Sequence, residues 1–160
     1  MTAEDVIAAL GLEPHPLEGG FFRETYRTAQ KIWGQDRSLA TAIYYLLAPQ
    51  AYSRMHKLPG DELFHFYLGD PVEQLHLRPD GTGEVVTLGT DMPAGHRPQV
   101  LVPGGFWQGA ALAAGGRFAL LGTTMSPGFA YPDYRAGDRI ELIQQFPAFA
   151  ERIQRLTPSE

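Results

Sequence analysis

Apolar and polar residues alternate over short segments through most of the chain, and Gly and Pro separate these segments. Alternation of this kind is typical of half-buried β-strands, and Gly and Pro mark the turns between them. The number and spacing of the segments indicate an all-β fold, a double-sheet jelly roll. The pattern predicts strands at residues 21–27, 39–47, 53–56, 62–68, 72–77, 83–88, 99–102, 106–112 and 117–125.

Helical patterns are confined to the two ends of the chain. Residues 2–11 carry an apolar stripe, and Thr2 with Asp5 forms a capping-box pattern. Near the other end, Asp138 can cap a helix over residues 139–146. We therefore expect one domain with short terminal helices, spanning residues 1–160, with a barrel core at about 21–135 and a helical segment at about 138–156.

The stretch from His56 to Gly69 combines a turn with residues that can carry chemistry. Its sequence is H-K-L-P-G-D-E-L-F-H-F-Y-L-G, and the Pro-Gly pair predicts a chain reversal between two neighbouring strands. His56 and Glu62 can then point the same way. Alternation places Glu62, Phe64 and Phe66 on one face. A carboxylate that leads a row of buried aromatic residues is costly unless it is paired, ligated or in a wet cavity, so this stretch indicates a site.

The spacing resembles the first motif of the cupins, G-x5-H-x-H-x3,4-E-x6-G. His56, Glu62 and Gly69 match its first His, its Glu and its last Gly, whereas Leu58 stands at the second His and Gln50 at the first Gly.

The second cupin motif, G-x5-P-x-G-x2-H-x3-N, is similar to the segment Pro103–Gln108, which keeps the Pro and the inner Gly. Gln108 stands where the motif has its His, Leu112 where it has its Asn, and Arg97 where it has its leading Gly. The two motifs together thus resemble those of a cupin in which two of the metal-binding His positions hold other residues.

Further stretches look like one small single-domain branch of the cupins, the cupin-5 type, long carried as a domain of unknown function. The resemblance implies a cupin double-stranded β-helix with its site inside the barrel. It also implies a homodimer, because small cupins often pair through edge strands. It implies little about activity, because the branch is mostly uncharacterised. The resembling stretches are Leu17–Tyr26, Thr41–Leu47, His56–Gly69, Val102–Gln108 and Ser126–Tyr134.

Two kinds of chemistry stay open for the candidate residues. In the metal hypothesis, His56, Glu62 and Gln108 are the ligands, and His76 can contribute if its strand faces inward. Because two imidazoles of the cupin set are lost, we expect either no cofactor or a weakly bound divalent metal. In the metal-free hypothesis, His56 is a base, Glu62 fixes its tautomer and Tyr44 is the acid on the far side. The expected ligand-binding residues are Phe64, Phe66, His76, Gln108 and Phe118.

The sequence does not decide whether the chain is an enzyme. We expect a small-molecule-binding cupin, in one form a carbohydrate or nucleotide-sugar isomerase or epimerase. The alternatives are a metal-dependent cupin enzyme with a reduced ligand set, or a non-catalytic ligand-binding protein in which a His–Glu hydrogen bond only satisfies two buried groups. His15 has no flanking site residues, so a surface position is expected for it.

The amino-acid composition limits the classes of molecule that this chain is expected to bind. The net charge is −5 and there is no basic stripe, which argues against nucleic acid. The chain has no cysteine, which excludes disulfides and thiolate chemistry. No segment approaches membrane-spanning length, and the acidic N-terminus lacks an apolar run of signal length. We therefore expect a cytoplasmic protein with no membrane partner.

Overall fold

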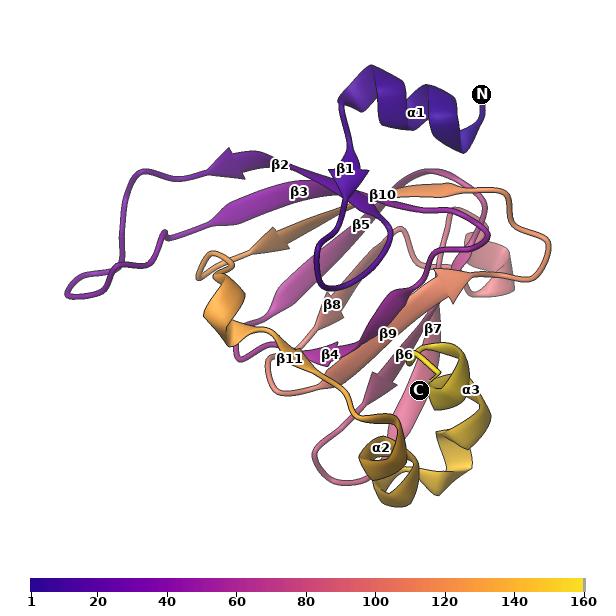
Figure 1. The fold of residues 1–160 in the computed structure, drawn as a ribbon. Coiled ribbons are helices and arrows are strands. Elements are labelled where there is room, and N and C mark those ends of the chain that lie inside the picture. Colours follow the sequence, from indigo (N-terminus) through magenta and orange to yellow (C-terminus); the bar gives the residue numbers. More distant parts are fainter. Residues whose placement is uncertain (160) are drawn as a thin grey trace.

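The computed structural model describes residues 1–159, and residue 160, the end of the predicted domain, lies outside them. Two antiparallel sheets are packed face to face (Figure 1), so the all-β double-sheet fold is confirmed. One sheet has the order β1-β2-β3-β10-β5-β8 and the other β11-β4-β9-β6-β7. The strands described are β1 (Glu13–Pro14), β2 (Phe21–Arg27), β3 (Thr41–Leu47), β4 (Ser53–Lys57), β5 (Glu62–Gly69), β6 (Val72–Leu77), β7 (Gly83–Leu88), β8 (Gln99–Val102), β9 (Trp107–Leu112), β10 (Ala119–Met125) and β11 (Arg135–Ala136).

Helices pack on the outside of the sheets (Figure 1). Helix α1 (Ala3–Leu10) begins after Thr2, which exchanges hydrogen bonds with Asp5 as the capping box predicts. Helices α2 (Arg139–Gln145) and α3 (Ala150–Arg155) share an apolar cluster with the five-stranded sheet. Short 3₁₀ turns lie at Met92–Ala94, Tyr131–Asp133 and Pro147–Phe149. None of the helices within residues 1–159 combines the length and the apolar character that a membrane crossing requires.

Side-chain alternation divides the core into an interior and two outer layers. Tyr45, Phe64 and Leu121 belong to the cluster between the two sheets. Leu46 and Phe118 belong to a separate cluster beneath α1. Successive residues of a strand face opposite sides, so each inward residue has outward neighbours. This parity decides which of the candidate residues can reach the interior.

The connection after β4 differs from the sequence prediction. The Pro59-Gly60 turn was expected to join neighbouring strands, but β4 pairs with β9 and β11, whereas β5 pairs with β10 and β8. The turn therefore passes from one sheet to the other. His56 and Glu62 consequently approach the interior from opposite sheets.

A second turn supports this connection. The backbone N–H of Gly104 donates to Asp61 Oδ1 at 2.8 Å, and that of Gly105 donates to the Leu58 carbonyl at 2.8 Å. A Cβ on Gly104 would lie 2.2 Å from the carbonyl oxygen of Pro59, so only glycine permits this approach. The two turns together fix the start of β5, where Glu62 lies.

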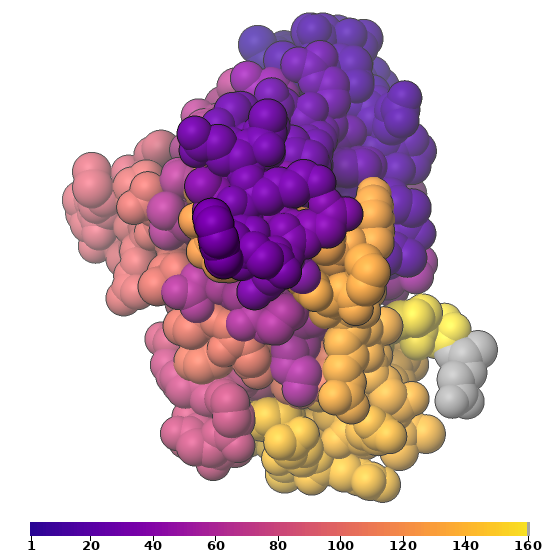
Figure 2. Space-filling view, turned by 90° about the vertical axis from the view of Figure 1, so that its left-hand side faces the viewer, coloured from indigo at the N-terminus to yellow at the C-terminus, as the bar shows by residue number. Residues whose placement is uncertain are grey.

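Residues 28–40, between β2 and β3, form a hairpin arm that extends beyond the sheet (Figure 1). Trp33 near its tip is 99% exposed. Arg37 of the arm forms an ion pair with Asp133 and donates to the Gly128 carbonyl at 3.0 Å. Figure 2 shows the arm in violet beside the orange segment that contains these partners. The arm is therefore tied to residues 126–134.

Candidate functional site

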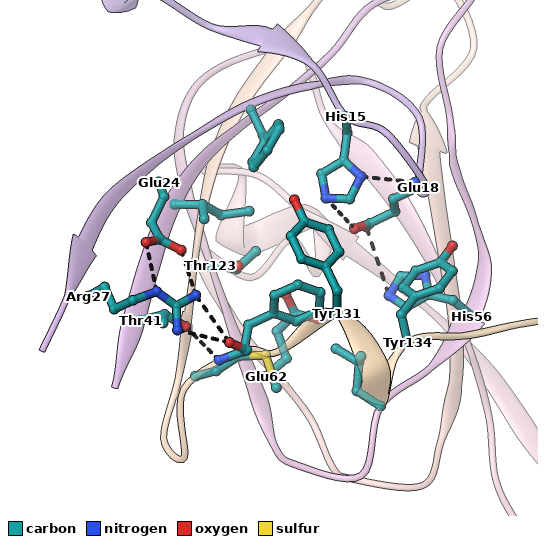
Figure 3. Close-up of a pocket in the computed structure, with 15 residues that line it drawn as sticks. His15, Glu18, Glu24, Arg27, Thr41, His56, Glu62, Thr123, Tyr131 and Tyr134 are labelled. Atoms are coloured by element: carbon teal, nitrogen blue, oxygen red, sulfur yellow. Dashed lines mark hydrogen bonds and ion pairs between the residues drawn. The ribbon is translucent and has the colours of Figure 1, made fainter. Parts of the chain in front are cut away.

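A cavity of about 50 Å³ lies between the two sheets and opens to solvent, enough room for a few water molecules. Its walls come from the β1–β2 loop, β2 to β5, β10 and the segment 126–134 (Figure 3). Titratable and aromatic side chains predominate among the lining residues, which are His15, Glu18, Phe22, Glu24, Arg27, Thr41, Ile43, His56, Leu58, Glu62, Thr123, Met125, Phe129, Tyr131 and Tyr134.

His56 is 1% exposed and presents one ring nitrogen to the cavity. Its Nδ1 lies 2.7 Å from the Arg54 carbonyl oxygen. A carbonyl can only accept, so Nδ1 carries the proton and Nε2 of the neutral ring does not. Burial lowers the pKa of His56, which keeps the ring neutral at pH 7. Nε2 is therefore available as a base.

His15 is held in the opposite tautomer. Its Nδ1 accepts hydrogen bonds from the backbone N–H groups of Glu18, at 2.9 Å, and Leu17, at 3.3 Å. The proton of the neutral ring is therefore on Nε2, which lies 3.7 Å from Glu18 Oε2. Burial lowers the pKa of His15 as well.

The expected surface position of His15 is wrong, because its side chain is only 6% exposed. The β1–β2 loop folds inward: the Tyr45 hydroxyl donates to the Gly19 carbonyl at 2.9 Å, and the backbone N–H of His15 donates to the Gly20 carbonyl at 2.9 Å. The contact between Tyr45 and Gly19 joins residues 26 positions apart, so local pattern does not reveal it.

Glu18 lies between the two histidines, and sequence reasoning missed it. Its Oε1 accepts from the Ser53 hydroxyl at 2.6 Å and lies 3.9 Å from His56 Nε2. Burial raises the pKa of Glu18. Figure 3 shows His15, Glu18 and His56 joined in one row. The sequence feature that could have pointed to Glu18 is its position directly before Gly-Gly, within the stretch Leu17–Tyr26 that resembles the cupin-5 branch.

Glu62 enters the cavity from the other sheet. Gln108 Nε2 donates to Glu62 Oε2 at 2.8 Å, and Gln74 Nε2 donates to Gln108 Oε1 at 3.3 Å. Burial and the nearby charge of Glu18 raise the pKa of Glu62 to about 7. The structure thus brings His56, Glu62 and Gln108 together, with His56 and Gln108 as direct cross-strand neighbours. Their chemical roles stay predictions.

Two of the candidate residues face away from this cavity. Tyr44 packs in the outer layer under α1, with its ring 6.1 Å from that of Tyr67, because Tyr45 takes the inward position. The placement of Tyr44 as an acid opposite His56 is therefore wrong. Phe118 lies in the same outer layer, because the inward positions of β10 begin at Ala119, so its placement as a ligand-binding residue is also wrong.

Three other candidates point into the barrel but do not line the cavity. Phe64 is part of the packed core between the sheets, and Phe66 packs against that core. His76 is the cross-strand neighbour of Gln108 on β6. Burial lowers the pKa of His76 to about 4, and its Nε2 has no hydrogen-bond partner within residues 1–159.

Residues 126–134 supply aromatic walls that sequence reasoning did not assign to the site. The Tyr134 ring stacks on His56 with centroids 5.0 Å apart. Its hydroxyl is buried without a hydrogen-bond partner in the described part of the chain. Burial raises the pKa of Tyr134, so the hydroxyl keeps its proton. The only signal in the sequence was the resemblance of Ser126–Tyr134 to the cupin-5 branch.

The positions that would hold a metal in the cupin motifs do not fit one here. Leu58 has no donor atom, and both amide atoms of Gln108 are used in hydrogen bonds to Glu62 and Gln74. Within the described residues, no group of three or more His, Asp or Glu side chains is arranged to hold a metal ion.

Solved structures resemble this fold over its whole length. A crystal structure of a protein from Shewanella oneidensis is 36% identical, with a TM-score of 0.92, covering 100% of this chain and 99% of that chain. A hypothetical protein from Leishmania major is 30% identical, with a TM-score of 0.90, covering 99% and 100%. Oxalate decarboxylase from Bacillus subtilis shares the fold at 14% identity, with a TM-score of 0.57, covering 93% of this chain and 38% of that chain.

No curated protein matches the sequence. The family model described as "Cupin superfamily (DUF985)", the cupin-5 family, matches residues 4–137. That match spans all the described strands and ends before the C-terminal helices α2 and α3. The chain belongs to this family of the cupin superfamily.

Proposed function

We propose that the cavity binds a small polar molecule and moves a proton on it, as an isomerase or epimerase of a carbohydrate-type substrate does. The observation that supports this is the opposite protonation of the two histidines beside Glu18. His56 offers an unprotonated Nε2, and His15 offers an Nε2–H. Isomerisation needs one group that removes a proton and another that supplies one.

The reaction can be written without a redox partner. His56 Nε2 takes the proton from a carbon next to a carbonyl, and the C–H electron pair forms a carbon–carbon double bond. The carbonyl oxygen takes a proton from the His15–Glu18 pair. A proton returned to the former carbonyl carbon gives the isomer, while the hydroxyl on the first carbon gives up its proton and becomes the new carbonyl. A proton returned to the opposite face of the first carbon gives the epimer, while the enol hydroxyl returns its proton to the His15–Glu18 pair and the original carbonyl re-forms. The pKa of His56, lowered by burial, keeps the base active at neutral pH.

Neither a nucleotide sugar nor a whole hexose fits inside the cavity, but a free sugar can place its carbonyl end there while the rest extends through the open side. The cavity volume is about 50 Å³. Arg27, the arginine among its lining residues, already donates to both carboxylate oxygens of Glu24, at 2.9 and 2.8 Å. A diphosphate would need such a guanidinium to be free.

Proton exchange into a sugar tests the proposal. The protein is incubated in D₂O with a panel of aldoses, ketoses and amino sugars, and deuterium at the carbon next to the carbonyl is followed by NMR. We expect exchange by the wild type and a loss of at least about 100-fold for His56→Gln. His65→Gln is the matched control, because His65 faces the opposite side of β5 and bonds to Thr124. Binding without exchange would contradict catalysis and favour a non-catalytic binding protein.

We further propose that the chain acts as a homodimer. The support is β8, an edge strand of the six-stranded sheet that carries the exposed apolar side chain of Leu101. Light scattering should give twice the chain mass of 17.6 kDa, and Leu101→Lys should shift the protein toward monomer. A wild-type monomer would refute the proposal.

A further inference from the structure

Carboxyl groups outnumber cationic side chains among the residues that line the cavity. Glu18 and Glu62 are largely buried there, and neither forms an ion pair with a Lys or Arg within residues 1–159. Arg27 is paired with Glu24 and also donates to the Phe129 carbonyl at 3.1 Å. Its charge is balanced before any ligand enters. A ligand therefore meets two carboxyl groups without a compensating cation.

The carboxyl oxygens and one imidazole nitrogen remain available as acceptors, beside two donors, the His15 Nε2–H and the Tyr134 hydroxyl. The oxygens of Glu18 and Glu62 can accept, and so can His56 Nε2, whose ring is 1% exposed and whose Nε2 forms no hydrogen bond within residues 1–159. An alkylammonium group has three N–H donors and no acceptor. It is the functional group that matches carboxyl oxygens of this kind.

Aromatic rings complete the surroundings of these acceptors. Phe22, Phe129 and Tyr134 line the same cavity, and the Tyr134 ring lies against His56. The faces of aromatic rings attract organic cations, most strongly where water is excluded. The walls thus favour a positively charged ligand over an anion of the same size.

We propose that this site takes a small organic cation, with its ammonium group at the carboxyl groups of Glu18 and Glu62, so that His56 Nε2 stays free as the base. The inference rests on the proposed function in one respect, that the substrate occupies this cavity, and it names the substrate as an amine. An ammonium hydrogen bond spans about 2.7–2.9 Å, longer than the roughly 2.0–2.2 Å of a zinc–ligand bond.

The same carboxyl groups couple binding to pH. Burial raises the pKa of Glu18, and burial together with the charge of Glu18 raises that of Glu62 to about 7. A bound cation stabilises the ionised forms and so releases protons. Affinity for an amine should therefore rise as the pH increases through about 7, as long as the amine stays protonated.

Three two-carbon probes separate charge from size. Ethanolamine, ethylene glycol and glycolate carry a positive charge, no charge and a negative charge. Protein NMR titrations near pH 8 should give ethanolamine at least about tenfold tighter binding than ethylene glycol, and no binding of glycolate. Affinity for ethanolamine should fall when the titration is repeated near pH 6.

Variants identify the groups responsible. Glu62→Gln and Glu18→Gln should each weaken ethanolamine binding about tenfold or more and weaken ethylene glycol binding much less. Glu73→Gln removes the same charge on the outer face, where Glu73 pairs with Arg152, and should have no effect.

Equal or tighter binding of ethylene glycol or glycolate would overturn the inference, as would no response to ethanolamine. Neither result depends on turnover. Deuterium exchange into a neutral sugar together with preferred ethylene glycol binding would refute the amine and leave the isomerase intact. Ethanolamine binding without any deuterium exchange into a sugar would refute the isomerase and leave the amine inference intact.

Discussion

At the scale of single residues, the cavity depends on where protons are held. The backbone sets the tautomers of His15 and His56, and burial sets the protonation of Glu18 and Glu62. Neighbouring carboxyl groups in a dry site repel each other when both are ionised. The protonation of these carboxyl groups therefore affects both the stability of the fold and the charge of the ligand that the site accepts.

The pKa of Glu62 predicts a falling stability with rising pH. A folded-state pKa raised from 4.5 to about 7 favours the protonated folded state, an effect of at most about 3 kcal/mol. This stabilisation is present below pH 4.5 and is lost as the pH rises through about 7. The free energy of unfolding, measured with urea from about pH 5 to about pH 8, should therefore decrease. In Glu62→Gln the free energy of unfolding should change less with pH. An unchanged pH dependence in that variant would show that another group causes the effect.

The Tyr134 hydroxyl should contribute to function at the expense of stability. It is buried without a partner in the described residues, so Tyr134→Phe should keep or raise the free energy of unfolding, by up to about 1 kcal/mol, and weaken ligand binding. Tyr45→Phe is the contrasting variant. Its hydroxyl donates to the Gly19 carbonyl at 2.9 Å, so its loss should cost about 1 kcal/mol. Equal costs in thermal or urea unfolding would show that the Tyr134 hydroxyl is satisfied.

At the scale of elements, the site depends on two turns that cross between the sheets. The turn before β5 and the turn before β9 are bonded to each other through Asp61 and Gly104. They set the start of β5 and hence the position of Glu62. A change in this contact should disturb the cavity from outside it.

Gly104→Ala should destabilise the protein by at least about 2 kcal/mol, because the new Cβ would lie 2.2 Å from the Pro59 carbonyl oxygen, a backbone atom. Gly60→Ala is the matched control. Its Cβ would meet only Met125 Cε, at 3.6 Å, and should cost no more than about 1 kcal/mol. Urea unfolding of both variants checks the difference, and similar values would mean that the turns can separate freely.

Alternation along the chain located nine of the eleven described strands, because a strand with one buried face must alternate. It missed β1 and β11, which have two residues each and are too short to show a pattern. It also separated Trp107, which packs under α2, from Gln108, which faces the interior. It could not decide which sheet each strand joins. The Pro59-Gly60 turn specifies a reversal, but pairing with β9 or β10 depends on residues far along the chain.

The site was predicted only in part for a similar reason. His56 and Glu62 were found from their spacing, whereas Glu18 and His15 reach the cavity through contacts of a loop with β3 and β4. Tyr44 and Tyr45 are adjacent and of the same type, so composition could not choose between them. The inward position of Tyr45 follows from the packed core, which only the assembled sheets define.

At the scale of the whole molecule, the cupin frame predicts how a metal site could be restored. Purified wild-type protein should carry less than about one transition-metal ion per two chains, because Leu58 and Gln108 replace imidazoles. Leu58 lines the cavity, and Gln108 bonds to Glu62. Leu58→His combined with Gln108→His should bind zinc or nickel stoichiometrically, with His56 and Glu62 completing the set. Stoichiometric metal in the wild type, lost in His56→Ala, would refute the expectation.

The order of the strands also bears on synthesis by the ribosome. β10 lies between β3 and β5, and β9 lies between β4 and β6, so the central strand of each sheet emerges after most of its neighbours. A nascent chain that ends at β8 leaves the edges of β3, β4, β5 and β6 without these partners, and such edges invite aggregation. Translation therefore commits the molecule to its fold only in its last third, and chains released early should need chaperones or be degraded.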